Sequence, residues 1–410
     1  MGLGTIIAQS INVLIQPILT RIVPAETLGI YTYIVSLATI VIPIASLKLD
    51  MLIVSEQDDN EAQYITDACV VINVLVAAIY SIVLTVGYFL PADNIFNKYG
   101  VVVFWVPLLT LTNGLRFLFI SYSNRYKQYK LISVMGMIRE GSRAVIQIMS
   151  GLLKCGVGGL TLGYALAPLF GMNLQLKDYF AKRKQRAKLT PKQFENIIFD
   201  KGKRQILYMV PAQFINSFSA SFVTISITAL YTAKELGYYS TGVRILEIPI
   251  IFITANVSKV CYQKISENVS KRKGVLKLFL SVLAGLTVIS VVGFVILYFV
   301  APQLCGIVFG EEYDIAGEYI RALCVMYAIR LVASSFSGIY TVFKKQNIEC
   351  ILNALLIVFG VISAALSWYF ELTINRYLTL ICIGYTVTYT IMLIGYYILC
   401  MRHDKNLTLE

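Results

Sequence analysis

Apolar stretches long enough to cross a lipid bilayer recur along the whole chain. A helix needs about 20 apolar residues to span the hydrocarbon core of a membrane. Twelve stretches satisfy this requirement, and the first of them is interrupted by Gln9, Asn12 and Gln16. The pattern predicts an all-α integral membrane protein with about twelve transmembrane helices, at 3–20, 28–48, 68–90, 101–122, 131–153, 156–177, 204–230, 236–262, 279–300, 315–342, 346–370 and 377–400.

The composition supports this class of protein. Of the 410 residues, 57% are hydrophobic and only 14% are charged, and the mean hydropathy is +0.72. A soluble domain carries about 25% charged residues, so a water-soluble globule is excluded. A disordered chain is excluded as well, because disordered chains are poor in hydrophobic residues and rich in charge.

The positive charge is distributed unevenly between the loops. The chain has 35 Lys and Arg against 23 Asp and Glu, which gives a net charge of +12. If the N-terminus is cytoplasmic, 24 of the basic residues fall in inside loops or the C-terminal tail and five fall in outside loops. Basic residues collect on the cytoplasmic side of membrane proteins. Both termini are therefore expected in the cytoplasm, and the positive charge does not indicate nucleic acid as a partner.

The two halves of the chain share short motifs in the same order. Ala8–Asn12 resembles Ala212–Asn216, and Glu26–Tyr31 resembles Lys234–Tyr239. Repeats of six spans are parallel repeats, which are typical of alternating-access transporters. We therefore expect two six-helix lobes related by pseudo-two-fold symmetry around a central cavity. The expected divisions are an N-terminal lobe at 1–177, a basic cytoplasmic linker at 178–203, a C-terminal lobe at 204–402 and a cytoplasmic tail at 403–410.

Charged residues inside the spans are the candidates for function, because a charge at the centre of a membrane helix costs about 2.5–3.5 kcal/mol on insertion scales. Arginine also matches phosphate oxygens with two parallel hydrogen bonds. The predicted substrate-binding residues of the cavity are Arg116, Arg139, Arg143, Arg244 and Arg330. The predicted charge partners or coupling residues are Glu140, Glu247, Asp50 and Glu349, with Asp50 closing the second span. The predicted polar lining is Gln9, Asn12, Gln16, Gln213, Asn216 and Ser334.

The spacing of these charges suggests how they pair. Arg139 and Arg143 lie four residues apart and share a helix face, and Glu140 is expected to partner one of them at most. Arg244 and Glu247 lie three residues apart, so a purely structural ion pair stays an open alternative for them. Since Arg outnumbers acidic residues at the centres of the spans, the predicted cavity favours an anionic substrate.

Other chemistries have little support in the sequence. His403 is the only histidine, so the chain has no Ser-His-Asp triad and no His-based metal motif. The eight cysteines form no C-x-x-C pair, which argues against a zinc site or a disulfide framework. We expect neither an enzyme nor a bound metal.

Residues 17–54 resemble the N-terminal signature of the Wzx-type oligosaccharide flippases of polysaccharide biosynthesis. The matching positions are Pro17, Leu19, Thr20, Arg21, Pro24, Gly29 and Tyr31, followed by Lys48, Asp50 and the pair Glu61-Ala62. The detailed resemblance covers about the first 70 residues. The twelve-span plan, the central basic loop and the duplication extend it over the whole chain.

The resemblance implies a transporter of the multidrug/oligosaccharidyl-lipid/polysaccharide (MOP) exporter superfamily. It implies that an undecaprenyl-pyrophosphate-linked oligosaccharide for O-antigen (lipopolysaccharide), capsule or exopolysaccharide is flipped from the inner to the outer leaflet of the bacterial cytoplasmic membrane. It implies alternating access with no cofactor, coupled to a proton or sodium gradient. The expected partners are the lipid-linked oligosaccharide, membrane lipids and other polysaccharide-assembly proteins.

Three alternatives stay open at this point. A multidrug or toxin exporter of the same superfamily would favour acidic residues in the first lobe, and the first span has none. A lipid II exporter commonly carries two further spans. A membrane polysaccharide polymerase or ligase usually needs a large extracytoplasmic loop, whereas the longest loop here is predicted on the inside.

Overall fold

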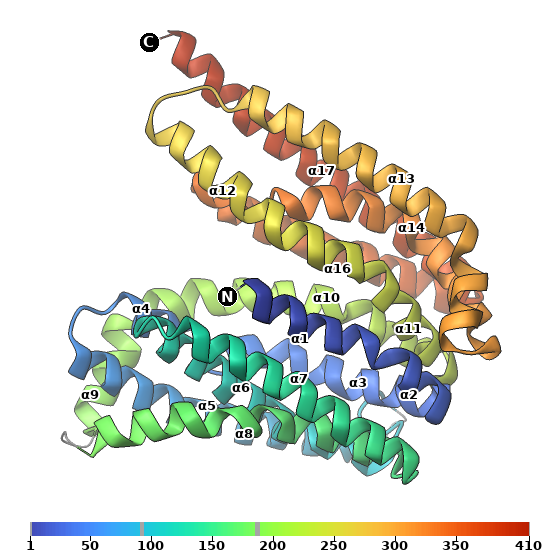
Figure 1. Cartoon of the computed structure of the whole chain (residues 1–410), viewed down its shortest axis with the longest axis horizontal. Coiled ribbons are helices and arrows are strands. Elements are labelled where there is room, and N and C mark those ends of the chain that lie inside the picture. Colours follow the sequence, from blue (N-terminus) through green and yellow to red (C-terminus); the bar gives the residue numbers. More distant parts are fainter. Residues whose placement is uncertain (1, 91–93, 185–188, 410) are drawn as a thin grey trace. The chain divides into compact units, whose positions relative to one another are not determined.

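The computed structural model describes residues 2–90, 94–184 and 189–409, and all regular structure in these ranges is helical (Figure 1). The prediction of an all-α fold is confirmed. The chain forms two compact units, Met1–Gly237 and Tyr238–Glu410, and each is described here by itself.

The described part of the first unit contains the broken N-terminal helix, six further long helices and several short ones. Its elements are α1 (Gly2–Leu14), α2 (Gln16–Ile22), α3 (Ala25–Val41), η1 (Ile42–Ile44), α4 (Asp50–Ser55), α5 (Asp59–Tyr88), η2 (Gly100–Phe104), α6 (Trp105–Arg125), α7 (Tyr129–Leu152), α8 (Gly156–Arg183), α9 (Pro191–Asn196), η3 (Ile197–Lys201), η4 (Gln205–Met209), α10 (Val210–Leu230) and the start of α11 (Ala233–Pro249).

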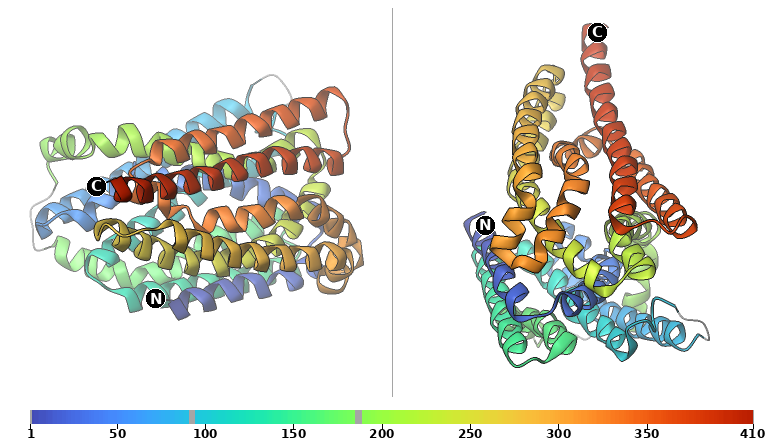
Figure 2. Two further views of the ribbon diagram at one scale, coloured as in Figure 1. Left: turned by 90° about the horizontal axis from the view of Figure 1, so that it is seen from above. Right: turned by 90° about the vertical axis from the view of Figure 1, so that its right-hand side faces the viewer.

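The second unit continues α11 and adds four long helices, of which α16 and α17 lie side by side (Figure 2). Its further elements are η5 (Ile250–Thr254), α12 (Ala255–Ser270), α13 (Leu276–Phe309), η6 (Glu311–Tyr313), α14 (Asp314–Ser335), α15 (Gly338–Val342), α16 (Gln346–Tyr369) and α17 (Ile374–Leu409).

Every predicted span corresponds to a helix or to two or three consecutive helices. Ten helical segments in the described ranges are long and apolar enough to cross a membrane. The two remaining predicted spans are occupied by α1 with α2 and by α7. The helix α7 is long enough, but it contains Lys130, Arg139, Glu140 and Arg143, so its charges set it apart from the other spans.

Two of the predicted spans differ from the observed helices for local reasons: one is broken and one ends early. The first span is broken at Ile15, because Pro17 follows at the second position of α2 and proline cannot donate the backbone hydrogen bond of a continuous helix. The second span ends at Ile44 rather than at 48, since Leu47 and Lys48 adopt left-handed φ angles of 49° and 59°. Asp50 therefore begins α4 and does not close the second span.

The segment predicted as a linker, 178–203, is largely folded onto the first unit. The helix α8 continues to Arg183, and α9 and η3 cover 191–201. The side chain of Ile197 is buried in a cluster with Leu49, Ile53 and Ile65. Residues 185–188 of this segment, and residue 410 of the predicted tail, lie outside the described residues.

The compact units divide after Gly237 and not within the predicted linker. The helix α10 packs against α3 in the first unit, although it is the seventh predicted span. The boundaries of the two six-helix lobes, which were inferred from the sequence repeat, stay a prediction.

A reciprocal contact supports the duplication. A Cβ atom added to Gly29 would lie 1.9 Å from the carbonyl oxygen of Ala233, and one added to Gly237 would lie 2.0 Å from that of Ala25. Gly29 and Gly237 are equivalent positions of the matched motifs, and Ala25 and Ala233 have the same offset. A local two-fold axis produces this reciprocity, and the close approach excludes any residue larger than glycine at either position.

Candidate functional site

The helix α7 holds three of the predicted residues in one ion-paired cluster. It packs between α1 and α8, so its polar face is partly covered. Glu140 is buried, and its two carboxylate oxygens form ion pairs with Nη2 of Arg139 and with Nη2 of Arg143, the latter at 2.7 Å. The prediction that Glu140 would partner one arginine at most was wrong. Arg143 lies one turn further along the helix, within reach, and the long Arg139 side chain folds back to its sequence neighbour.

The helix α6 adds a third arginine to this group. The Arg116 guanidinium lies close enough to Arg139, Glu140, Arg143 and Tyr164 for their charges to act on one another. It also packs over the ring of Phe117, with its central carbon 4.2 Å from the ring centroid. We name Arg116, Arg139, Glu140 and Arg143 the arginine cluster.

The helix α1 closes one side of the arginine cluster. Arg143 Nη2 donates to Asn12 Oδ1 at 2.5 Å, and Gln16 Nε2 donates to the Asn12 carbonyl oxygen at 3.2 Å. Gln9, one turn earlier on α1, is half-buried. The predicted polar stripe of α1 therefore meets the predicted arginines at Asn12.

The arginine cluster has an excess of positive charge and of hydrogen-bond donors. Three guanidinium groups share one carboxylate, which leaves a local charge of +2. The Nε atoms of Arg116, Arg139 and Arg143 are all buried and have no hydrogen-bond acceptor in the described part of the chain. Buried polar groups are nearly always hydrogen-bonded, so three unsatisfied donors together mark a site whose chemistry suits an anion with several oxygen atoms.

The second unit brings together Arg330 and Glu247 from helices α14 and α11. Their closest nitrogen and oxygen atoms are 3.7 Å apart, and the Arg330 guanidinium lies 5.1 Å from the ring centroid of Tyr327. Glu247 thus has a partner in another helix. Arg244 lies near the buried Tyr313 hydroxyl, within electrostatic range.

Ser334 lies near this pair but is not its most buried hydroxyl. Its side chain is half-buried, whereas the next residue, Ser335, is buried and donates to the carbonyl oxygen of Leu331 and to Thr254 Oγ1. The spacing of polar residues along α14 indicates which side of the helix is buried only to within one residue position, so it did not distinguish Ser334 from Ser335.

The remaining predicted residues lie apart from the arginine cluster. Asp50 accepts a hydrogen bond from Ser121 at 3.0 Å, and burial raises the pKa of its carboxyl group above the usual value. Glu349 lines a cavity of about 300 Å³ in the second unit together with Lys259. Gln213 donates to Ser217 Oγ at 3.2 Å. Asn216 is exposed on α10.

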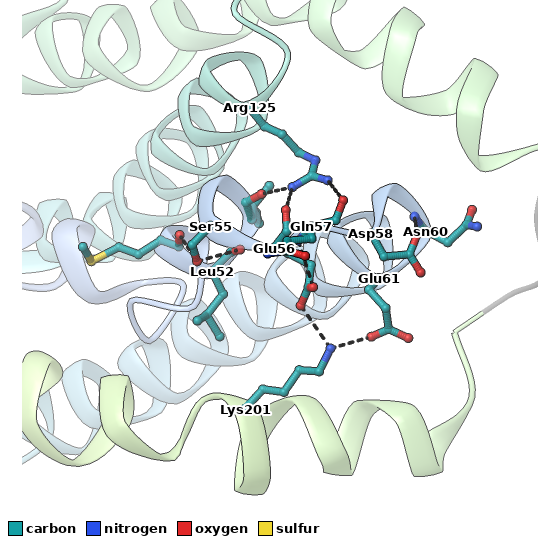
Figure 3. A network of polar contacts seen from close by, with 11 residues as sticks. Leu52, Ser55, Glu56, Gln57, Asp58, Asn60, Glu61, Arg125 and Lys201 are labelled. Carbon is teal, nitrogen blue, oxygen red and sulfur yellow. Dashed lines mark hydrogen bonds and ion pairs between the residues drawn. The ribbon is translucent and has the colours of Figure 1, made fainter.

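A second ion network, which the sequence did not indicate, surrounds the turn between α4 and α5 (Figure 3). Arg125 donates to the backbone carbonyls of Ile53 and Glu56, and its guanidinium lies 2.7 Å from the Asp59 carboxylate. On the other side of the turn, Lys201 of η3 bridges Glu56 at 3.1 Å and Glu61 at 2.8 Å. The hydrogen bond from Lys201 lowers the pKa of Glu56, and the two carboxylates raise the pKa of Lys201.

The Lys201 contacts fasten the segment after α8 to the rest of the first unit, and the Arg125 contacts fasten α6 to the α4–α5 turn. The positive-charge count identified Arg125 and Lys201 only as topology signals. Since both bind residues distant in sequence, no local pattern could have indicated their second role.

The described part of the chain contains no cluster of side chains that could form a metal site. Within residues 2–90, 94–184 and 189–409 no three His, Cys, Asp or Glu side chains are grouped so that they could hold a metal ion. All eight cysteines are free thiols.

Comparison with known proteins identifies a family and a fold. The sequence profile of the family described as "Polysaccharide biosynthesis protein" matches residues 18–317. No curated protein sequence matches the chain.

Several solved structures share the fold. An inward-facing multidrug resistance transporter of the MATE family, in the MOP superfamily, is 14% identical, and the alignment covers 98% of this chain and 99% of that one with a TM-score of 0.69. The lipid II flippase MurJ in an inward closed conformation is 12% identical, with 100% and 91% coverage and a TM-score of 0.75. A MOP superfamily transporter from Pyrococcus furiosus is 15% identical, with 99% and 95% coverage and a TM-score of 0.63. At these identities the likeness extends to the fold alone.

Proposed function

The chain belongs to the polysaccharide biosynthesis protein family, and on that premise we propose that it is a transporter that flips a lipid-linked oligosaccharide across a membrane. The proposed substrate is an undecaprenyl-pyrophosphate-linked repeat unit of O-antigen, capsule or exopolysaccharide. The proposed reaction is transbilayer movement by alternating access, with no covalent chemistry. The multi-span architecture supports this proposal.

The single observation that carries the proposal is the set of three buried Nε donors in the arginine cluster. A pyrophosphate bears several oxygen acceptors and negative charge, and arginine recognises such groups through paired hydrogen bonds. The ion pairs to Glu140 hold Arg139 and Arg143 in place before the ligand arrives. Such preorganisation reduces the entropy lost on binding.

The partial neutralisation by Glu140 also suits release. A transporter must let its substrate leave on the other side, so an anion site must not bind too tightly. Because Glu140 competes with the ligand for the same two guanidinium groups, the cluster keeps a charge of +2 rather than +3. The proposed role of Glu140 is therefore both to position the arginines and to limit their affinity.

The orientation and the energy source belong to the same proposal. The 24-to-5 distribution of basic residues supports an orientation with both termini inside. The proposed location is the bacterial cytoplasmic membrane. A proton or sodium gradient is the proposed driving force, and Asp50 and Glu349 are the candidate coupling carboxylates. The proposed partners are membrane lipids and the other proteins that assemble the polysaccharide.

A lipid II exporter is a second candidate function, favoured by the structural likeness to MurJ. Lipid II also carries a pyrophosphate, so the arginine cluster fits both substrates. A cationic-drug exporter fits less well, because a site with a charge of +2 repels cations. Deleting the gene separates these functions: loss of surface polysaccharide in living cells supports the first, and lysis with blocked peptidoglycan synthesis supports the second.

The double variant Arg139→Ala/Arg143→Ala tests the proposal in cells that need the chain for surface polysaccharide. We expect at least a hundredfold loss of surface polysaccharide, with normal amounts of the protein in the membrane. Arg321→Ala is the matched control, because Arg321 is also an arginine within a span but pairs with Glu318 at 2.8 Å outside the cluster. Wild-type polysaccharide from the double variant would contradict the proposal.

A further inference from the structure

The ion pair of the second unit is surrounded by tyrosines from three helices. Tyr239 comes from α11, Tyr327 from α14, and Tyr385 and Tyr389 from α17. Their phenol groups, Arg330 and Glu247 lie within electrostatic range of one another. We name these six residues the tyrosine cluster.

The groups of the tyrosine cluster have unused hydrogen-bonding capacity. The Arg330–Glu247 separation of 3.7 Å is an ion pair but too long for a hydrogen bond. The side chains of Arg330 and Glu247 are 28% and 38% exposed, so both reach the surface of the unit. The Tyr385 hydroxyl is buried and has no hydrogen-bond partner in the described part of the chain, and Tyr385 itself is only 6% exposed.

The chemistry of this cluster differs from that of an anion site. One arginine and one glutamate cancel in charge, so the cluster has no net attraction for a phosphate. It offers instead aromatic faces, a planar donor, a carboxylate acceptor and phenol hydroxyls, which donate and accept. A sugar ring presents an apolar face of C–H groups and a rim of hydroxyls, and such a ligand needs both aromatic surface and paired donors and acceptors.

We propose that the tyrosine cluster of the second unit is a binding site for sugar rings. This inference rests on the proposed function, because it assigns the sugar portion of that same substrate. Tyr389 is half-buried and is the proposed aromatic contact for a sugar ring, whereas Tyr327 and Tyr385 are buried. Arg330 and Glu247 bond the ring hydroxyls.

The test measures the affinity of the purified full-length chain for two probes by native mass spectrometry. One probe is undecaprenyl pyrophosphate, which has the charged headgroup and no sugar. The other is the lipid-linked oligosaccharide extracted from membranes of the cells in which the chain is native. We expect the wild type to bind the second probe at least tenfold more tightly than the first.

Tyr389→Ala is the decisive variant, since a half-buried position tolerates truncation. We expect it to weaken binding of the sugar-bearing probe about tenfold, the effect of about 1.4 kcal/mol, and to change binding of undecaprenyl pyrophosphate less than twofold. Tyr389→Phe keeps the ring and should lose less than half of that effect. Glu247→Gln should also weaken only the sugar-bearing probe. Tyr369→Ala, an exposed tyrosine at the end of α16, is the control.

The outcomes distinguish a failure of the proposed sugar site from a failure of the proposed transport function. If the wild type binds both probes but Tyr389→Ala and Glu247→Gln change neither affinity, or change both equally, the sugar site is overturned and the proposed function stands. If the wild type binds neither probe, the proposed function falls and the sugar site falls with it.

Discussion

The arginine cluster and the tyrosine cluster begin from the same feature, an arginine inside a membrane span, and differ in what surrounds it. In the first unit two arginines form close ion pairs with one buried glutamate, and the charge of a third arginine, Arg116, acts on the same group. In the second unit one arginine faces one half-buried glutamate at 3.7 Å among tyrosines. The difference teaches that an intramembrane arginine is not by itself an anion site. The number of charges, and the donors left without acceptors, decide what it binds.

The two glutamates should differ most in their effect on stability. Removing the buried partner of an ion pair costs about 3–5 kcal/mol, whereas an exposed pair contributes about 0–1 kcal/mol. We expect Glu140→Ala to lower the melting temperature in detergent by many degrees and Glu247→Ala to leave it nearly unchanged. Thermal unfolding of both variants, purified in parallel, measures the contrast. Equal shifts in melting temperature would contradict the claim that burial makes the Glu140 ion pairs more important for stability than the Glu247 ion pair.

Replacing arginine by lysine should sharpen the comparison at the level of ligand binding. Lysine keeps the charge but loses the planar fork that bonds two phosphate oxygens together. We expect Arg139→Lys to weaken the binding of undecaprenyl pyrophosphate about tenfold, and Arg330→Lys to change it less than twofold. Binding isotherms for the two variants provide the check. A similar loss in both would contradict the assignment of the pyrophosphate to the arginine cluster.

The smallest effect is expected at the network around the α4–α5 turn, where Lys201 bridges Glu56 and Glu61. The lowered pKa of Glu56 means that its contribution is present above its ordinary pKa of 4.5 and is lost as the pH falls through the lowered value. The raised pKa of Lys201 means that its contribution is present below 10.5 and is lost as the pH rises through the raised value.

Lys201→Ala should therefore cost less than about 1 kcal/mol between pH 5 and 10, as expected for exposed pairs. Lys203→Ala, a neighbouring exposed lysine, is the control. Unfolding temperatures across that pH range measure the effect. A large loss of stability would place this network among the principal supports of the first unit, alongside the arginine cluster.

Local patterns in the sequence predicted the helices well, because the length of an apolar stretch is a local property. The break at Ile15 and the early end of the second span depend on Pro17 and on the turn at Leu47 and Lys48. The break at Ile15 therefore has a local cause in the sequence, since Pro17 lies within the first predicted span. The burial of Ile197 depends on residues far away in the sequence, such as Leu49, Ile53 and Ile65. The basic residues of the predicted linker therefore gave no indication of how this segment packs.

The two candidate sites likewise combine features that a local sequence pattern predicts with features that depend on long-range packing. The spacing of Arg139 and Arg143 predicted a shared face, which is local information. The approach of Arg116 from α6 and of Asn12 from α1 is long-range, and only their presence inside spans pointed to them. Tyr239, Tyr385 and Tyr389 of the tyrosine cluster were not predicted, because tyrosine is abundant in this chain, with 27 residues, and individual tyrosines in apolar stretches carry no distinguishing pattern.

The central claim is that the arginine cluster binds the pyrophosphate of a lipid-linked sugar, and one measurement addresses it directly. The affinity of the purified wild type is compared for undecaprenyl pyrophosphate and for undecaprenol, which has the same chain and no charge. We predict at least hundredfold tighter binding of the pyrophosphate in the wild type, and a preference reduced to within fivefold in Arg139→Ala/Arg143→Ala. An equal preference in the wild type and the variant would contradict the claim.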